Sequence, residues 1–190
     1  MRPVLRRARD LVAVPWRNGQ GMTRDVATQL GPDGALLWQV SIAELVRDTS
    51  FSDYAGYDRI FTPVRGEGIA LSLDGGAFLP CPLLAPFAFR GEASVECRLG
   101  GSPGRAFNVI AARGRCQAQV QVLRLAVGER IEPPAEGAGL LHCWSGALAV
   151  EEAEVQAGDT LIGAAAVAAA PSVVIQVHVL ETSRSSASQG

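Results

Sequence analysis

The sequence of 190 residues contains no lysine, since all 17 of its basic residues are arginine. This absence excludes catalysis through a lysine, either as a Schiff base or as a general base. Histidine is also scarce: His142 and His178 stand 36 positions apart, and neither belongs to an H-x-H or H-x-x-x-E pattern. A metal site made of clustered imidazoles is therefore not expected, and the sequence predicts neither a metal nor another cofactor.

Long apolar stretches and an excess of charge are missing as well. The longest weakly polar stretch, residues 161–175, is interrupted by Gly163 and Pro171 and is too short for a membrane-spanning helix. No apolar run follows the charged residues at the N-terminus, so no signal peptide is predicted. The 17 basic and 19 acidic residues give a formal charge of −2, which argues against binding to nucleic acid or to an anionic membrane.

Only four cysteines are present, and none forms a C-x-x-C pair: they are Cys81, Cys97, Cys116 and Cys143. A chain of this length does not need disulfide bonds to hold its core together. We expect free and mostly buried thiols in a protein of the reducing cytoplasm, with a disulfide framework as the alternative.

Short apolar runs separated by turns dominate the chain, which has 21 glycines, 11 prolines and no long amphipathic helix. This pattern predicts an all-β sandwich or barrel. The apolar side chains at positions 38, 40 and 42 share one face of a predicted strand. The side chains at positions 39, 41 and 43, two of them polar, share the opposite face. In residues 117–127 the apolar positions change parity midway, which indicates a β-bulge or a strand that crosses between sheets.

A weak internal repeat indicates that the β units are duplicated. Residues 64–71 and 144–150 both read as strand, glycine turn and strand, and each is later followed by another strand. Repeats on this scale predict two small β-barrels or jelly rolls in one chain. The expected domains are a first barrel over residues 1–128 and a second over 129–182, which can share strands with the first. The serine-rich residues 183–190 are expected to form a disordered tail.

Polar side chains with binding chemistry are concentrated in the first 110 positions. The candidates for a ligand site are Trp16, Arg17, Asn18, Thr23, Ser41, Ser52, Arg59 and Asn108. Several have an alternative structural role: Trp16 can be a core aromatic, Asn18 can cap a turn, and Arg59 can pair with an acidic residue. A buried Asn108 needs either an internal partner or a ligand, because an unbonded amide costs roughly 1–3 kcal/mol.

Several of these residues stand in motifs that resemble the HutD/Ves family. The motifs are Trp16-Arg17-Asn18, Ser41-Ile42-Ala43, Phe51-Ser52, Gly56-x-x-Arg59, Pro86-Phe87-Ala88-Phe89 and Phe107-Asn108-Val109, in the order of the family and near its spacings. The resemblance implies a bicupin fold without a catalytic metal. It further implies a link to histidine utilisation through binding or sensing of N-formylglutamate, or a stress-related role, with no established enzymatic activity.

Three positions depart from the pattern of that family. Gln20 replaces the middle glycine of the loop, Gln39 stands where the family often has arginine, and Asp25 stands where it tends to have glutamate. If an arginine at position 39 contacts a ligand carboxylate in the family, the ligand preference of this protein differs.

The residues and the resemblance together predict a protein that binds a small anionic metabolite without converting it. Arg17 and Arg59 can each hold a carboxylate through two parallel hydrogen bonds. The amides and hydroxyls of the other candidates would then recognise an amide, a formyl group or a second carboxylate, with Trp16 as one wall of the pocket.

Two other functions remain open on the same residues. A metal-independent cupin enzyme, an isomerase or hydrolase acting on a small carboxylate, would use Glu44 or Asp25 as general base in a desolvated pocket. A protein-interaction module would instead use exposed sheet edges, with its pocket filled by side chains. Such edges can also pair two copies of the chain in a homodimer.

Overall fold

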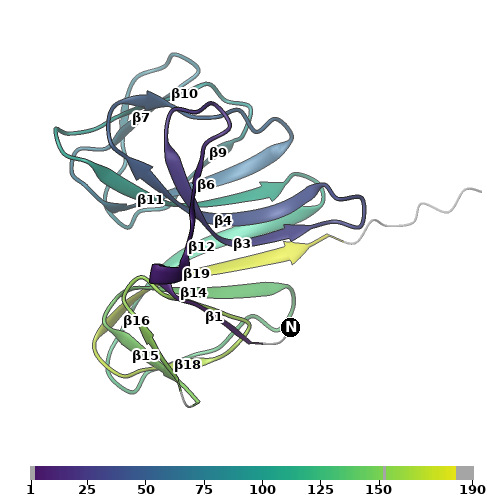
Figure 1. The fold of residues 1–190 in the computed structure, drawn as a ribbon, viewed down its shortest axis with the longest axis vertical. Helices are drawn as coiled ribbons and strands as arrows, with labels where there is room; N and C mark the ends of the chain where they lie inside the picture. The colour runs from purple at the N-terminus through teal and green to yellow at the C-terminus, as the bar shows by residue number, and fades with distance from the viewer. Residues whose placement is uncertain (1–2, 152, 183–190) are drawn as a thin grey trace, which may run out of the picture.

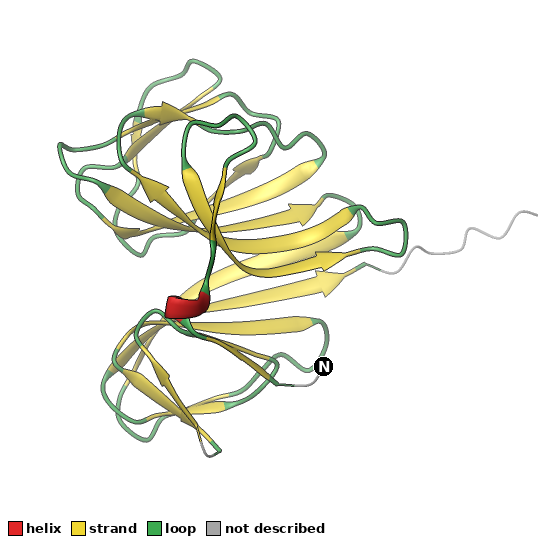
Figure 2. Ribbon diagram, viewed as in Figure 1, coloured by secondary structure: helices red, strands yellow, loops and turns green. Residues whose placement is uncertain are grey.

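The computed structural model describes residues 3–151 and 153–182, and these residues are mostly β-strand (Figure 2). A single turn of 3-10 helix, η1 (Ala8–Asp10), is the only helical element of this part of the chain. The all-β prediction is therefore confirmed, whereas the tail expected at residues 183–190 lies outside the described residues. Nothing helical in the described chain has the length and apolar character needed to span a bilayer.

The strands form four antiparallel sheets. A six-stranded sheet in the order β2-β3-β4-β11-β6-β9 contains β2 (Ala13–Pro15), β3 (Met22–Leu30), β4 (Leu36–Leu45), β6 (Tyr57–Arg65), β9 (Phe87–Arg90) and β11 (Gly104–Ala112). A four-stranded sheet in the order β5-β10-β7-β8 contains β5 (Thr49–Ser50), β7 (Ala70–Leu73), β8 (Leu79–Pro80) and β10 (Val95–Arg98). These two sheets form what we call the first half.

The second half likewise consists of a large and a small sheet. A five-stranded sheet in the order β1-β17-β14-β19-β12 contains β1 (Val4–Arg6), β12 (Cys116–Leu125), β14 (Ala138–Ser145), β17 (Thr160–Ile162) and β19 (Ser172–Glu181). A four-stranded sheet in the order β13-β18-β15-β16 contains β13 (Arg130–Ile131), β15 (Ala147–Val150), β16 (Ala153–Gln156) and β18 (Ala166–Ala168).

The two large sheets face each other in the middle of the molecule, and each small sheet lies on the outer side of its large one (Figure 1). A central hydrophobic core joins the large sheets through residues such as Val40 of β4 and Val177 of β19, both fully buried. In each half one further core lies between the large sheet and its small partner. It surrounds Leu71 in the first half and Leu148 in the second. The six-stranded sheet is therefore covered by the five-stranded sheet on one face and in part by its small partner on the other.

Each half is a pair of facing sheets, and none of the four sheets closes on itself within the described residues. Strands from before residue 128 pair with the second half, and the expectation left such sharing of strands open. β12, which precedes that point, pairs with β19 of the second half, so the chain crosses between the halves after β11. β1 belongs to the second half as well, because it pairs with β17. Long-range strand pairing therefore decides which half each strand joins.

β12 explains the change of parity noted in the sequence. Its register with β19 runs unbroken from Cys116 to Leu125, so the predicted β-bulge is wrong for this strand. Val120 and Val122 pack on the central core, whereas Leu123 packs on the core of the second half. The apolar positions change parity because the two ends of the strand pack on different cores.

A buried histidine lies where the two halves meet. His142 on β14 is 4% exposed, and its Nδ1 lies 2.9 Å from the Thr160 hydroxyl. Its ring packs on Phe107 of β11, with ring centres 5.0 Å apart. Burial lowers the pKa of His142 to about 4, although the Asp159 carboxylate raises it in part. The imidazole is therefore neutral in the folded protein at neutral pH.

We expect the free energy of unfolding to fall as the pH drops from 6.5 to 4, because the unfolded chain binds a proton at His142 that the folded protein excludes. His142 accounts for about 1–3 kcal/mol of this fall in the free energy of unfolding. His142→Gln keeps a hydrogen-bonding side chain without an imidazole and should remove that share in urea unfolding measured across this pH range. His178→Gln leaves His142 in place and should retain it. An unchanged pH profile in His142→Gln would contradict the assignment.

Candidate functional site

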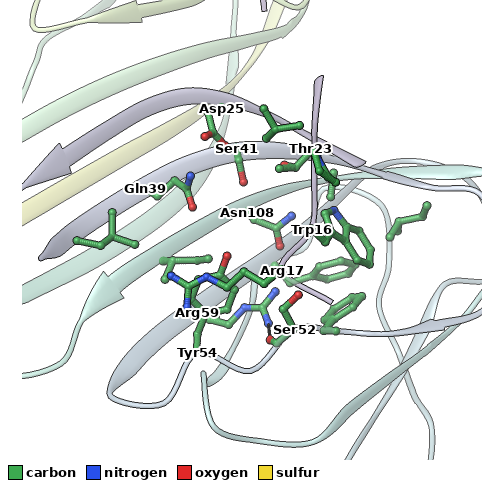
Figure 3. Close-up of a pocket in the computed structure, with 18 residues that line it drawn as sticks. Trp16, Arg17, Thr23, Asp25, Gln39, Ser41, Ser52, Tyr54, Arg59 and Asn108 are labelled. Atoms are coloured by element: carbon green, nitrogen blue, oxygen red, sulfur yellow. Dashed lines mark hydrogen bonds between the residues drawn. The ribbon is translucent and has the colours of Figure 1, made fainter. Parts of the chain in front are cut away.

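A pocket of about 330 Å³ opens on the face of the six-stranded sheet opposite the central core (Figure 3). Strand alternation produces it: on β4, Trp38 and Val40 enter the central core, while Gln39 and Ser41 line the pocket. The alternation read from the sequence is thereby confirmed. The same alternation on β11 places Asn108 in the pocket between two residues of the central core.

Most of the candidate ligand residues meet in this pocket although they come from distant segments. The pocket is lined by Trp16, Arg17, Thr23, Ser41, Ser52, Arg59 and Asn108, together with Asp25. The strands β2, β3, β4, β11 and β6 supply its sheet side, and the loops after β2 and β5 supply the rest. The structure therefore brings together polar groups that are up to about ninety positions apart in the chain.

Arg59 on β6 brings a buried positive charge to the pocket. It is 7% exposed, its Nη1 donates to the Ser52 carbonyl at 3.1 Å, and its Nε has no hydrogen-bond partner. The guanidinium carbon lies 5.1, 5.2 and 5.3 Å from the ring centres of Phe89, Phe51 and Tyr54. No salt bridge among the described residues includes Arg59, so the alternative of a structural ion pair is not observed.

This environment leaves the charge of Arg59 incompletely compensated. Burial lowers the pKa of Arg59 to about 10, with Tyr54 opposing the shift, so the guanidinium is still charged at neutral pH. The faces of the aromatic rings stabilise a cation. They do not accept the in-plane hydrogen bonds of a guanidinium as a carboxylate does. The arrangement therefore favours an anion as the missing partner.

Arg17 supplies a second guanidinium beside the first. It is exposed and lies over the Tyr54 ring, 4.4 Å from its centre. Tyr54 thus contacts both Arg17 and Arg59, and it fixes the two cations on the same side of the pocket (Figure 3). Two neighbouring guanidiniums of this kind can bind either one carboxylate between them or two carboxylates.

The amide of Asn108 has only part of its hydrogen-bonding capacity used. The side chain is 7% exposed, and its Nδ2 donates to the Ala106 carbonyl at 3.3 Å. Among the described residues no donor reaches its Oδ1. The Ala106 carbonyl therefore satisfies one N–H of the Asn108 amide, and its Oδ1 is free to accept from a ligand. Ser41, its cross-strand neighbour, points its hydroxyl toward the same space (Figure 3).

The loop between β2 and β3 presents Trp16 as one wall of the pocket, but Asn18 does not line it. The Nδ2 of Asn18 donates to the Ser50 carbonyl at 3.0 Å, and its Oδ1 accepts from the Gln20 amide at 3.1 Å. Asn18 therefore holds the turn, which is the alternative considered for it from the sequence. Gly21 lies against the indole: a Cβ there would be 2.7 Å from Trp16 ring atoms.

Glu44 lies outside the pocket, which corrects the expectation that it could act there as a general base. It follows Ala43 on β4, and alternation turns its side chain to the other side of the sheet. There its carboxylate pairs with Arg24 and with Arg105, the latter at 2.9 Å. Burial tends to raise the pKa of Glu44, but the two arginines lower it overall.

Asp25, the other acid considered from the sequence, does line the pocket. It pairs with Ser41 and is followed by a shift of register between Asp25 and Ala27. Alternation places Val26 in the central core and Asp25 at the pocket, and the β-bulge lets Ala27 pack on the central core beside Val26. Asp25 is exposed at the mouth of the pocket, and partial burial of its carboxyl raises its pKa, while a hydrogen bond with Gln39 lowers it in part.

Sequence reasoning missed Tyr54 and did not place Gln39 in the ligand site. Gln39 could have been found, because it shares the face of Ser41 on β4. Tyr54 gives no signal of this kind, since it lies in a loop after β5. Its position depends on a long-range contact, in which its backbone N–H donates to the Gly91 carbonyl at 2.9 Å.

The thiols and the histidines lie away from the pocket. All four cysteines are free and buried, as predicted. His178 on β19 has its Nε2 2.8 Å from the Glu136 carbonyl. Across residues 3–151 and 153–182, no group of three His, Cys, Asp or Glu side chains is placed to hold a metal ion.

The fold and the pocket define this molecule as an all-β protein of cupin-like fold. A solved cupin 2 conserved barrel domain protein from Leptotrichia buccalis gives a TM-score of 0.60 and 11% identity over 95% of this chain and 96% of its own, a likeness of fold alone. A family model described as HutD matches residues 8–182. The chain belongs to the HutD family, which confirms the resemblance read from its motifs.

Related proteins agree with this assignment. An uncharacterized 21.2 kDa protein in the hutC 3′ region of Pseudomonas putida is 40% identical over 119 residues, 62% of either chain. Protein Ves of Cronobacter sakazakii is 38% identical over 109 residues, 56% of this chain and 59% of its own. These matches thus span about three fifths of each curated relative. The solved HutD from Pseudomonas fluorescens SBW25 gives a TM-score of 0.81 and 27% identity over 95% of this chain and 100% of its own.

Replacing Arg59 by methionine should stabilise the protein when no ligand is present. The lowered pKa of Arg59 corresponds to a desolvation cost of roughly 3 kcal/mol. Loss of the cation–π contacts offsets about 1–2 kcal/mol of it. We therefore expect Arg59→Met to raise the free energy of unfolding by about 1–2 kcal/mol in urea titrations. The exposed Arg130→Met should stay within about 0.5 kcal/mol of wild type. A destabilised Arg59→Met would show that the charge is compensated internally.

Gly21→Ala should displace the Trp16 indole, because the added Cβ overlaps the ring. The expected loss of stability is about 1 kcal/mol, since a half-buried ring can move. In amide NMR spectra, one of the three tryptophan indole N–H signals should shift strongly. Gly75→Ala, at a position with open space around it, should leave all three signals in place. Unmoved indole signals in Gly21→Ala would mean that Gly21 does not position this wall.

Proposed function

We propose that the protein is a metal-free bicupin that binds or senses a small carboxylated metabolite, such as N-formylglutamate, without converting it. The two pairs of facing sheets are the proposed cupin units, and the pocket of the first half is the proposed binding site. We further propose a role in histidine utilisation. The family membership and the hutC 3′ region in the name of the Pseudomonas putida relative support this role.

The observation that carries this proposal is the state of Arg59. A charged guanidinium that is 7% exposed, with an unbonded Nε and no carboxylate partner among the described residues, is costly unless an anion completes it. It borders a pocket of about 330 Å³, which is enough space for a small metabolite. A carboxylate of the ligand would supply both the charge and the acceptor atoms that are missing.

The expected affinity follows from the same contacts. Each charge-assisted contact of Arg17 or Arg59 with a carboxylate contributes roughly 1.5–3 kcal/mol. Two such contacts give about 3–6 kcal/mol before the cost of ordering the ligand, with further gains from Asn108 and Ser41. These sums suit a metabolite bound in the micromolar to millimolar range.

N-formylglutamate matches the functional groups of the pocket in number and kind. Its two carboxylates can bind the neighbouring guanidiniums of Arg17 and Arg59, and its formyl oxygen can accept a hydrogen bond from the Ser41 hydroxyl. Because the pocket lies in the first half, a single protein copy suffices for binding. We also propose a cytoplasmic location, which the four free thiols support. A homodimer through exposed edge strands is a further proposal.

A second function, a metal-independent isomerase or hydrolase, is favoured by one observation. Asp25 lines the pocket, and burial raises its pKa, as a general base or acid requires. Turnover of small carboxylates that is lost in Asp25→Asn, with binding retained, would support this function. Glu44 takes no part in it, because its carboxylate lies on the other side of the sheet.

Isothermal titration with N-formyl-L-glutamate tests the binding proposal. We expect a dissociation constant in the micromolar to millimolar range for wild type and at least about tenfold weaker binding for Arg59→Met. Arg130→Met removes one positive charge from the second half and should bind as wild type does. Absence of binding in wild type, or equal binding in wild type and Arg59→Met, would overturn the proposal.

A further inference from the structure

Charged groups of opposite sign lie on opposite sides of the proposed binding pocket. Figure 3 shows Arg17, Arg59, Ser52 and Tyr54 together on one side, and Asp25, Ser41 and Thr23 together on the other, with Asn108 between the two groups. The pocket is therefore dipolar, with two guanidiniums at one end and a carboxylate at the other.

The register of the strands explains this separation. Asp25 of β3, Ser41 of β4 and Asn108 of β11 are cross-strand neighbours in one row. In the next row Gln39 of β4 pairs with Ile110 of β11, and Ile110 pairs with Arg59 of β6. Asp25 and Arg59 thus stand three strand spacings apart, about 14 Å between their backbones before the side chains reach inward. A ligand that contacts both must lie across the strands.

The Asp25 carboxylate has no cation of the protein to neutralise it. Among the salt bridges of the described residues none includes Asp25. The preceding Arg24 points to the other side of the sheet, where it pairs with Glu44. The polar neighbour that affects Asp25 is the neutral amide of Gln39. An ionised carboxylate can only accept hydrogen bonds, so this end of the pocket is suited to a donor.

From this arrangement we infer that the pocket selects carboxylates that also carry an N–H group, with Asp25 as the residue that accepts this N–H. The inference rests on the proposed function, since Arg17 and Arg59 must hold the carboxylate end. The ligand class is thus an N-acylated amino acid or an amino acid, in which the carboxylate and the N–H belong to one small molecule. An analogue with an oxygen in place of the N–H leaves Asp25 without a donor and sets two lone-pair-bearing atoms against each other.

A pair of ligands that differ in one group tests the role of the N–H. N-formyl-L-glutamate carries the N–H, and 2-(formyloxy)glutarate, its ester analogue, has an oxygen at that position and keeps both carboxylates. We expect wild type to bind the amide about ten- to a hundredfold more tightly than the ester, as measured by isothermal titration.

Variants at position 25 test whether Asp25 is the acceptor. Asp25→Ala should weaken binding of the amide to the level of the ester and leave the ester at least as tightly bound as in wild type. Asp25→Asn keeps the shape and a neutral acceptor, so it should retain part of the preference, and it serves if the alanine variant does not fold. Glu154→Ala removes an exposed carboxylate from β16 of the second half and should preserve the full preference.

The outcomes separate the inference from the proposed function. A preference for the amide that disappears in Asp25→Ala supports the inference. Equal binding of amide and ester by wild type, lost in Arg59→Met, overturns the inference and leaves the proposed function standing. A preference that persists in Asp25→Ala overturns the assignment of Asp25. Failure of wild type to bind either ligand overturns the proposed function itself, and the inference with it.

Discussion

The six-stranded sheet has two faces, and the packing of one face against the five-stranded sheet determines what the other face can do. Side chains of β4 and β11 that enter the central core are apolar and fully buried, as Val40 and Phe107 are. Because side chains alternate along a strand, the positions between them are free to carry polar groups on the opposite face. The small sheet of β5, β7, β8 and β10 covers only part of that face, around Leu71 and Phe61. The pocket occupies the rest, so its polar lining depends on the apolar contact behind it.

The fold class and most of the pocket lining could be predicted from the sequence, because both depend on local patterns. Alternation in residues 38–43 places Ser41 on the polar face of β4, and the amide of Asn108 stands out in an apolar strand. The free thiols also follow from cysteine spacing alone. Glu44 shows how such a pattern can be overlooked, since its position on β4 already indicated that it faces away from Ser41.

The remaining features depend on contacts between distant segments, which a single sequence does not encode locally. The assignment of β12 to the second half follows from its pairing with β19, some sixty residues later. The bulge after Asp25 lets the adjacent Val26 and Ala27 both pack on the central core, so it depends on the contact between the two large sheets. Tyr54 is placed by the Gly91 backbone, and only this placement makes its ring a support for both Arg17 and Arg59.

The pairing of β1 with β17 has a consequence for how the chain reaches its native state. Val4 pairs with Ile162, and the Arg7 guanidinium lies 2.7 Å from the Asp159 carboxylate across 152 positions of sequence. Loop closure over such a separation is entropically costly, and proteins rich in distant contacts of this kind fold slowly. The five-stranded sheet gains its outer edge strand only when the earliest and the late segments of the chain have met. During synthesis β1 must therefore wait, unpaired, until residues 160–162 have left the ribosome.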